Sequence, residues 1–405
     1  MPGIHSASAT ATATSAKAGS GARCDAFDLR LARGQLGAGL AFDLPLTSRA
    51  ADVLPAIGDL SLNASANVRH VARFGTLTDS TLGLAWTPLT GVQVLANLRR
   101  SAAAPDLQQL STPPRVIDNV PIFDFASGRT EAITLLLGGN PDLRAERRRT
   151  RTLSLTWQPW AARPLRLATS YEVTTIRDQT GTVFATTPRV EALLPDLFVR
   201  DAAGRLRSVA FRPGNFAWQR QRKLQLSLTA SGRIGRPPIP AAEGTASTPD
   251  KRPSFYLGAV PILALEDRLQ PSAGSAFLDL LDGDSIGTFV PRWSGYAYGG
   301  VNAGGYGGTF SLYYGGTRRI RSDDPASDLT FLPILQLGFT GYLPADDLLP
   351  AQDWARGLQL RLEVADLLDS RQRVRDANGQ VPSRFQTDLI SPLGRIVTLS
   401  LRQRF

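Results

Sequence analysis

The feature of this sequence that most constrains its fold is an alternation of apolar and polar residues that recurs from end to end. In the segment 59–71, DLSLNASANVRHV, every second residue is apolar and the residues between are polar as far as Arg69. A period of two places successive side chains on opposite faces of a β-strand, whereas an amphipathic helix needs a period near 3.6. The same alternation recurs at 82–87, 153–158, 165–173, 223–228, 310–314, 358–364 and 397–402. The chain is therefore predicted to be all-β, built from strands with two unlike faces.

Spans of the length that a membrane barrel needs give about thirteen strands. They are 34–46, 58–73, 79–88, 91–102, 148–159, 164–177, 216–231, 253–266, 289–303, 306–318, 330–343, 355–366 and 393–405. Pro261 and Pro333 weaken two of them, because a proline cannot donate to the hydrogen-bond ladder. Bacterial single-chain barrels usually have an even number of strands. The odd number indicates either a miscount or a barrel that lacks some of its strands.

The connections between these strands are very unequal in length. Short links at 87–91 and 160–164 alternate with long polar stretches at 103–147 and 179–215. Outer-membrane barrels combine short periplasmic turns with long extracellular loops, and they carry aromatic residues where strands cross the interfaces. The six tryptophans are placed near strand ends, at Trp86, Trp157, Trp160, Trp218, Trp293 and Trp354. An antiparallel transmembrane β-barrel is predicted; a large soluble β protein is the alternative, and it leaves the long loops unexplained.

Composition excludes several other classes of protein. Of 405 residues, 42% are hydrophobic and 20% charged, and no apolar run reaches the roughly 18 residues of a membrane-spanning helix. The single cysteine, Cys24, excludes an internal disulfide framework and a cysteine-based zinc site. The net charge of +10 comes mostly from arginines spread through the whole chain. Nucleic-acid binding is not expected, because it needs a clustered basic footprint.

The N-terminus has a composition of its own. A Ser/Ala/Thr tract runs from Ser6 to Gly21 without the basic and apolar regions of a signal peptide. Residues 1–25 are predicted to be a low-complexity disordered tail, and residues 26–405 a barrel domain. Without an export signal, export of the chain as given is doubtful.

Several segments follow recognisable patterns. They are GNPDLRAE at 139–146 leading into RTLSLTWQP at 151–159, RSAAAPDLQQL at 100–110, LEVADLLD at 362–369, and the closing strand from PLGR at 392–395 to LSLRQRF at 399–405. They resemble the GNPxLxPE, FRAPSLxEL, VxNLFD and terminal-strand segments of TonB-dependent outer-membrane receptors. The central segments 195–201, 212–216 and 278–283 are similar to a subgroup of these receptors with uncharacterised ligands. The resemblance covers roughly residues 30–405.

This resemblance implies a fold and a set of partners. Such receptors have a signal peptide, a short box that engages TonB, a plug domain and a 22-stranded barrel, and they import scarce nutrients such as metal chelates or carbohydrates. The chain begins inside the barrel portion, so it is expected to be a plug-less fragment that is not competent for TonB-driven import alone. TonB is therefore expected as a partner only of full-length relatives. In the family, a terminal strand ending in an aromatic residue is read by the barrel-assembly machinery. Here that strand presents Val397, Leu399, Leu401 and Phe405.

Residues that could carry catalysis or bind metal are few. The two histidines, His5 and His70, have no neighbouring catalytic motif, so no catalytic residue and no cofactor are predicted. Asp279, Asp282 and Asp284 lack the spacing of a calcium loop. The glycine-rich stretch 304–308 is predicted to be a turn, because glycine tolerates positive φ.

One basic cluster could bind an anion. Arg147, Arg148, Arg149 and Arg151 flank a predicted strand, where guanidinium groups could pair bidentately with lipopolysaccharide phosphate. The alternative is an ordinary basic strand end at headgroup level. The sequence thus predicts an outer-membrane receptor or transporter of unknown ligand, with outer-membrane lipid and lipopolysaccharide as partners. The alternatives are a small porin-like or adhesin barrel and an outer-membrane hydrolase.

Overall fold

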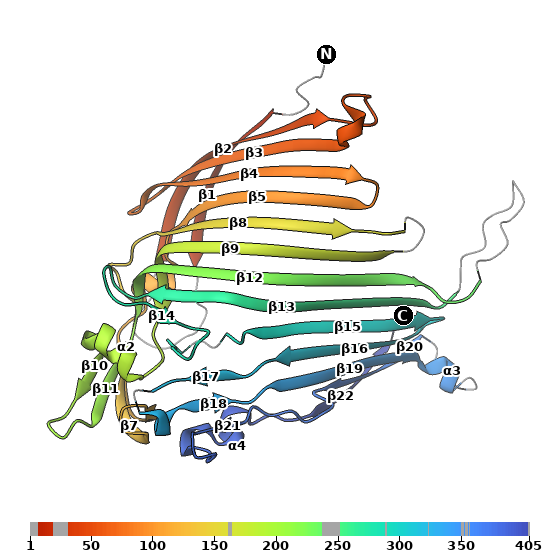
Figure 1. Ribbon diagram of the computed structural model, residues 1–405. Helices are drawn as coiled ribbons and strands as arrows, with labels where there is room; N and C mark the ends of the chain where they lie inside the picture. The colour runs from red at the N-terminus through yellow and green to blue at the C-terminus, as the bar shows by residue number, and fades with distance from the viewer. Residues whose placement is uncertain are drawn as a thin grey trace, which may run out of the picture.

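The chain forms one large curved antiparallel sheet with smaller folded elements at one end (Figure 1). The computed structural model describes residues 7–18, 31–160, 164–236, 252–287, 290–322, 324–349, 352, 355 and 357–403. The strands of the large sheet are β1 Ala7–Ala18, β2 Leu31–Thr47, β3 Asp59–Val71, β4 Gly75–Leu89, β5 Val92–Ala103, β8 Glu146–Trp157, β9 Leu165–Thr182, β12 Pro213–Arg233, β13 Ser254–Gln270, β15 Trp293–Ala303, β16 Tyr306–Gly315, β19 Ile334–Pro344, β20 Leu358–Ala365 and β22 Ile396–Gln403. The short strand β14, Leu278–Asp279, pairs with β13 beside this path.

The order of strands in the sheet is their order in the chain, from β1 to β22. Every neighbouring pair is antiparallel, as in a series of hairpins. In the part of the chain that the structure describes, no pairing joins β22 to β1, so the sheet has two edges. The sequence-based prediction of an antiparallel sheet of barrel type is confirmed.

Two small sheets and short helices occupy the end of the large sheet that we call the loop end, at the left of Figure 1. One small sheet contains β6 Arg115–Asp124, β7 Arg129–Leu137, β10 Phe198–Arg200 and β11 Leu206–Phe211; the other contains β17 Arg318–Ile320, β18 Leu329–Phe331 and β21 Val374–Arg375. The helices at this end are α1 Leu107–Ser111, α2 Pro188–Leu193 and α4 Thr387–Ile390, whereas α3 Ala345–Leu348 lies at the opposite end of the sheet, between β19 and β20 (Figure 1). Connections at the opposite end, the turn end, include the two-residue turns at 90–91 and 304–305. None of the described helices is long and apolar enough to cross a membrane.

The structure corrects the predicted strands in three places. All thirteen predicted strands have a counterpart, but the sheet path holds a fourteenth, β1, within the tail that was expected to be disordered over 1–25. Its sequence, ASATATATSAKA, itself alternates, and threonine favours strands. The predicted strand 330–343 is two strands, because Pro333 separates β18 from β19. The stretches 103–147 and 179–215, expected to be loops, contain β6, β7, β10 and β11.

Glycines and tyrosines pack together on one face of β13, β15, β16 and β19. A Cβ added to Gly258 would lie 2.3 Å from the Tyr298 ring, and one added to Gly307 would lie 2.3 Å from the ring of Tyr342. The rings therefore lie flat over backbone where only glycine fits. The Tyr342 hydroxyl donates to Asn302 Oδ1 at 2.7 Å, which fixes the orientation of that ring. This part of the sheet is thus packed by rings that lie along the wall.

Candidate functional site

The two faces of the large sheet differ in chemistry, as the alternation predicts. Strand register places Leu62 opposite Leu84, Leu84 opposite Ala96, and Ala96 opposite Leu153, so these residues form one apolar row across β3, β4, β5 and β8. We call this side the leucine face. Leu153 is 55% exposed, and Leu82 and Leu155 on the same face are also exposed. A continuous exposed apolar surface of this kind suits contact with lipid.

The opposite side, the polar face, carries the intervening residues. Asn63, Asn97 and Thr152 lie there, one residue along from the leucine row. Further across the sheet, Lys223 Nζ forms an ion pair with Glu172 at 3.1 Å. Polar groups and paired charges on one face, with leucines on the other, are the arrangement of a barrel wall between lipid and an aqueous lumen.

The folded elements of the loop end have hydrophobic cores of their own. One core lies between the first small sheet, α2 and the ends of β12 and β13, and includes Ile133, Val190, Leu206, Val209 and Leu269. A second core contains Phe123, Phe125, Ile320, Leu329, Phe331 and Val374. We call these elements together the cap. Its buried aliphatic and aromatic side chains show that the long connections form a packed structure over the loop end.

A single arginine joins three segments of the cap. The Arg200 guanidinium donates two hydrogen bonds of 2.7 Å to Glu191, two of 2.9 Å to Asp124 and one of 2.9 Å to the Gly204 carbonyl. Asp124 is fully buried, with 0% exposure. Burial alone would raise the pKa of Asp124, but hydrogen bonds from Arg200 and from the Ala126 N–H outweigh it and hold that pKa below its usual value. The hydrogen bonds to Asp124 and Glu191 raise the pKa of Arg200 in turn.

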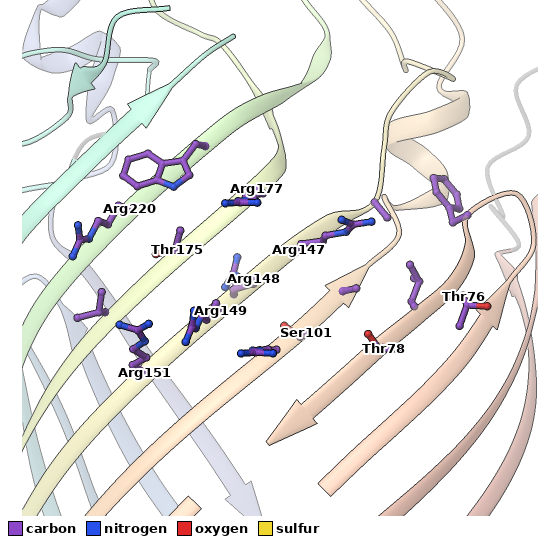
Figure 2. A pocket seen from close by; sticks show the side chains of 17 residues that line it. Thr76, Thr78, Ser101, Arg147, Arg148, Arg149, Arg151, Thr175, Arg177 and Arg220 are labelled. Carbon is purple, nitrogen blue, oxygen red and sulfur yellow. The ribbon is translucent and has the colours of Figure 1, made fainter. Parts of the chain in front are cut away.

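A second group of arginines lies on the large sheet near the loop end and lines a cavity of about 790 Å³ (Figure 2). We call it the arginine patch, and its members are Arg100 on β5, Arg147, Arg149 and Arg151 on β8, Arg177 on β9 and Arg220 on β12. Register places Arg149 opposite Arg100 and Arg147 opposite Arg177. Like charges directly opposite on neighbouring strands destabilise a sheet. The patch therefore concentrates positive charge at a cost in stability.

Few acidic groups compensate this charge. Among the residues that the structure describes, Arg100, Arg147, Arg149, Arg151 and Arg177 form no ion pair. Arg220 lies 3.8 Å from Glu266, but Glu266 is already engaged by Arg222 at 2.7 Å. The side chains of β8 at this site are exposed. The arrangement can bind an anion with several oxygen atoms, because guanidinium groups donate in pairs to phosphate or carboxylate.

The structure separates the residues that the sequence marked out. It brings Arg147, Arg149 and Arg151 into the patch; Arg148 lines the same cavity but points to the opposite face of β8 by alternation and forms an ion pair with Glu146 at 3.0 Å (Figure 2). Sequence reasoning missed Arg100, Arg177 and Arg220. They lie on other strands. The sequence signal that could have found them is that each of these arginines is an even number of residues away from the apolar residues of its own strand, and therefore shares their face.

The acidic residues and histidines considered in the sequence analysis do not come together in a site among the described residues. Asp282 pairs with Arg321 at 2.9 Å and Asp284 with Arg189 at 3.4 Å, while burial raises the pKa of Asp284. No group of three or more potential metal ligands occurs among the described residues. His70 is exposed on β3, and His5 lies outside the described residues.

The terminal strand has the predicted orientation where it is described. Val397, Leu399 and Leu401 are all exposed on the leucine face of β22, opposite Val364, Leu362 and Leu360. Phe405, like Trp354, lies outside the described residues. Of the other tryptophans, Trp86 and Trp157 lie at the turn end and Trp218 and Trp293 at the loop end.

The comparison with solved structures gives one consistent result. The chain is similar to the ferric enterobactin receptor PfeA of Pseudomonas aeruginosa, with TM-score 0.51, 15% identity, and coverage of 91% of this chain and 44% of that one. It is also similar to the siderophore receptor PirA of Acinetobacter baumannii, with TM-score 0.51, 13% identity, and coverage of 93% and 46%. For the outer membrane transporter YddB of Escherichia coli the TM-score is 0.55, the identity 10%, and the coverage 93% and 46%.

Comparisons of the sequence itself give no further relatives. No protein-family model matches the chain, and the search of curated proteins finds no match. The chain spans less than half the length of the solved structures it matches. These structures are receptors and transporters rather than enzymes. The fold of this chain is therefore that of the TonB-dependent outer-membrane receptors that its sequence motifs resemble.

Proposed function

We propose that the chain forms part of the barrel wall and the cap of an outer-membrane receptor that takes up a scarce nutrient. A metal chelate is the preferred ligand class, and a carbohydrate is the alternative. The observation that carries this proposal is the overlap of 91% of the chain with the ferric enterobactin receptor. The leucine face supports an outer-membrane location. The cap supports ligand recognition at the loop end, because binding residues are frequently presented on loops held by a rigid scaffold.

The packed cap also distinguishes this proposal from the porin-like alternative. A passive pore needs an open aqueous path, whereas the cap places two hydrophobic cores at the loop end of the sheet. An adhesin or a hydrolase has no comparable support, because the similar structures are receptors and transporters.

We expect outer membranes that contain the full chain, produced behind an added export signal in cells lacking their own ferric-chelate receptors, to bind radiolabelled ferric enterobactin saturably. Membranes from cells without the chain are the control. Competition by excess unlabelled ferric chelate, but not by a maltodextrin, is the expected pattern. Binding of the maltodextrin alone would favour the carbohydrate class, and equilibration of both solutes without saturation would favour a passive pore.

The proposal includes three protein or lipid partners: TonB for full-length relatives, the barrel-assembly machinery, and the lipid and lipopolysaccharide of the outer membrane. TonB-driven import is not expected of these 405 residues by themselves. Recognition by the assembly machinery is proposed to depend on Val397, Leu399, Leu401 and Phe405.

Deleting Phe405 is expected to reduce insertion into the outer membrane several-fold when the chain carries an added export signal. The reason is that the aromatic end residue completes the alternating strand that the machinery binds. Deleting Met1 to Gly21 instead is expected to have a smaller effect, since the described part of that segment, β1, lies at the other edge of the sheet. Quantitative immunoblotting of outer-membrane fractions measures both, and equal losses from the two deletions would argue against the assigned role of the terminal strand.

A further inference from the structure

The arginine patch lies on the leucine face, not on the polar face. On β8 the residues of one face are, in order, Arg149, Arg151, Leu153, Leu155 and Trp157, because alternate residues of a strand share a face. On β12 the same face carries Arg220 and Arg222, followed by Leu224 and Leu226. The arginines therefore continue the apolar surface toward the loop end.

This position sets where a ligand of the patch must lie. The apolar row from Leu62 to Leu153 would contact the hydrocarbon of a bilayer, so the residues one or two steps toward the loop end lie at the level of the headgroups. A solute inside the barrel would meet the polar face, with Thr152 and Glu172, and not this side. The ligand is therefore a component of the outer leaflet.

The chemistry of the patch specifies an anion with several oxygen atoms. Arg100, Arg149 and Arg177 have no carboxylate partner among the described residues, and register places arginine directly against arginine. Opposed guanidinium groups repel one another unless an anion lies between them. Phosphate accepts paired hydrogen bonds from guanidinium groups, and a lipid with more than one phosphate could engage several members of the patch together.

We propose that the arginine patch binds the phosphate groups of lipopolysaccharide in the outer leaflet, beside the wall formed by β5, β8, β9 and β12. The proposal rests on the outer-membrane location given under the proposed function. It deepens that proposal, because it assigns the lipopolysaccharide partner to a specific site on the wall, outside the lumen and the cap. Thr175 lies between Arg149 and Arg220 in the same cavity, and Trp218 lies opposite Arg177.

The first test needs no variant. The full chain, purified in detergent, is titrated with lipopolysaccharide that carries its lipid phosphates and with the same lipid after their enzymatic removal, and Trp fluorescence follows binding. The phosphorylated lipid is expected to bind at least about tenfold more tightly. Equal affinity for the two lipids would overturn the proposal. Displacement of the lipid by an equal concentration of inorganic phosphate would overturn the assignment to a lipid.

The second test removes charge from the patch. The triple variant Arg100→Gln, Arg149→Gln, Arg177→Gln is expected to lose about tenfold or more in affinity for the phosphorylated lipid and to retain its affinity for the dephosphorylated one. It should fold, since it loses repulsion between opposed arginines. The matched control is Arg205→Gln, Arg207→Gln, Arg321→Gln, which removes the same charge from the cap and is expected to bind like the unchanged chain.

The two triple variants decide between a site and a general charge effect. Equal weakening by both would show that only net charge matters and would overturn the proposal. Because lipid binding is measured without any nutrient, it is independent of the receptor test. Loss of ferric-chelate binding with intact lipid selectivity would refute the receptor function alone.

Discussion

Replacing Leu62 with arginine is expected to destabilise the sheet in a bilayer by about 2–4 kcal/mol. Leu62 lies on the leucine face, between Leu44 on β2 and Leu84 on β4. An arginine at that position would place a charge on the surface that contacts hydrocarbon. The measurement is reversible folding into phospholipid vesicles, followed by urea titration.

The neighbouring residue supplies the control. Asn63→Arg introduces the same side chain one residue along, on the polar face, which is the side of a barrel wall that meets the aqueous lumen. Its expected cost is far smaller. If the two substitutions lowered the free energy of unfolding equally, the leucine face would not be in contact with lipid.

Replacing Arg200 with methionine is expected to destabilise the cap by about 3–5 kcal/mol near neutral pH, because Asp124 would remain buried and charged without its partner. Local opening of β6, α2 and β10 should increase accordingly, and amide hydrogen exchange of these elements measures it. The control is Arg205→Met. Arg205 is 59% exposed beside Asp201 and its ion pair is expected to contribute no more than about 1 kcal/mol.

The stability that the charged Asp124 contributes to the cap is expected to decrease as the pH falls. Its folded-state pKa is lowered, so the contribution is fully present above the unfolded pKa of about 3.9 and is lost as pH falls through the folded value. The unchanged cap should therefore open more readily in acid below about pH 4. The difference between the unchanged chain and Arg200→Met should shrink there as Asp124 becomes protonated. A difference that stayed constant down to pH 2 would contradict the ionic account of this cluster.

The large sheet could be predicted from sequence because a wall between lipid and water forces a period of two on every strand that crosses it. The period is clear over residues 59–69 of β3 and residues 152–157 of β8. The strands of the cap were not predicted, because a segment outside the membrane does not need one face toward lipid and one toward water. In β6, Asn119 has φ of +58° and the register shifts between Ile117 and Val120, so the alternation is broken where the strand is irregular.

The arginine patch was only partly predictable for a different reason. Arg147, Arg149 and Arg151 are neighbours in sequence, so their cluster is visible directly. Arg100 and Arg177 lie on other strands, and only the register of β5, β8 and β9 brings them together. A position within a strand can be read from its own alternation, but the match between strands depends on loops whose geometry the sequence does not specify.

The sequential order of the large sheet has a consequence for how such a protein assembles and changes size. Among the described residues, each strand along the path of the large sheet pairs with the strand before it and the strand after it in that path, and β13 pairs in addition with the short β14. The sheet can therefore grow one hairpin at a time. Each new pairing of neighbouring strands joins residues that are close in the chain, except where a cap segment lies between the two strands. Gaining or losing a terminal hairpin leaves every other register intact and changes only the curvature and the perimeter. Sheets of this topology are thus modular along their perimeter, with the hairpin as the unit of variation.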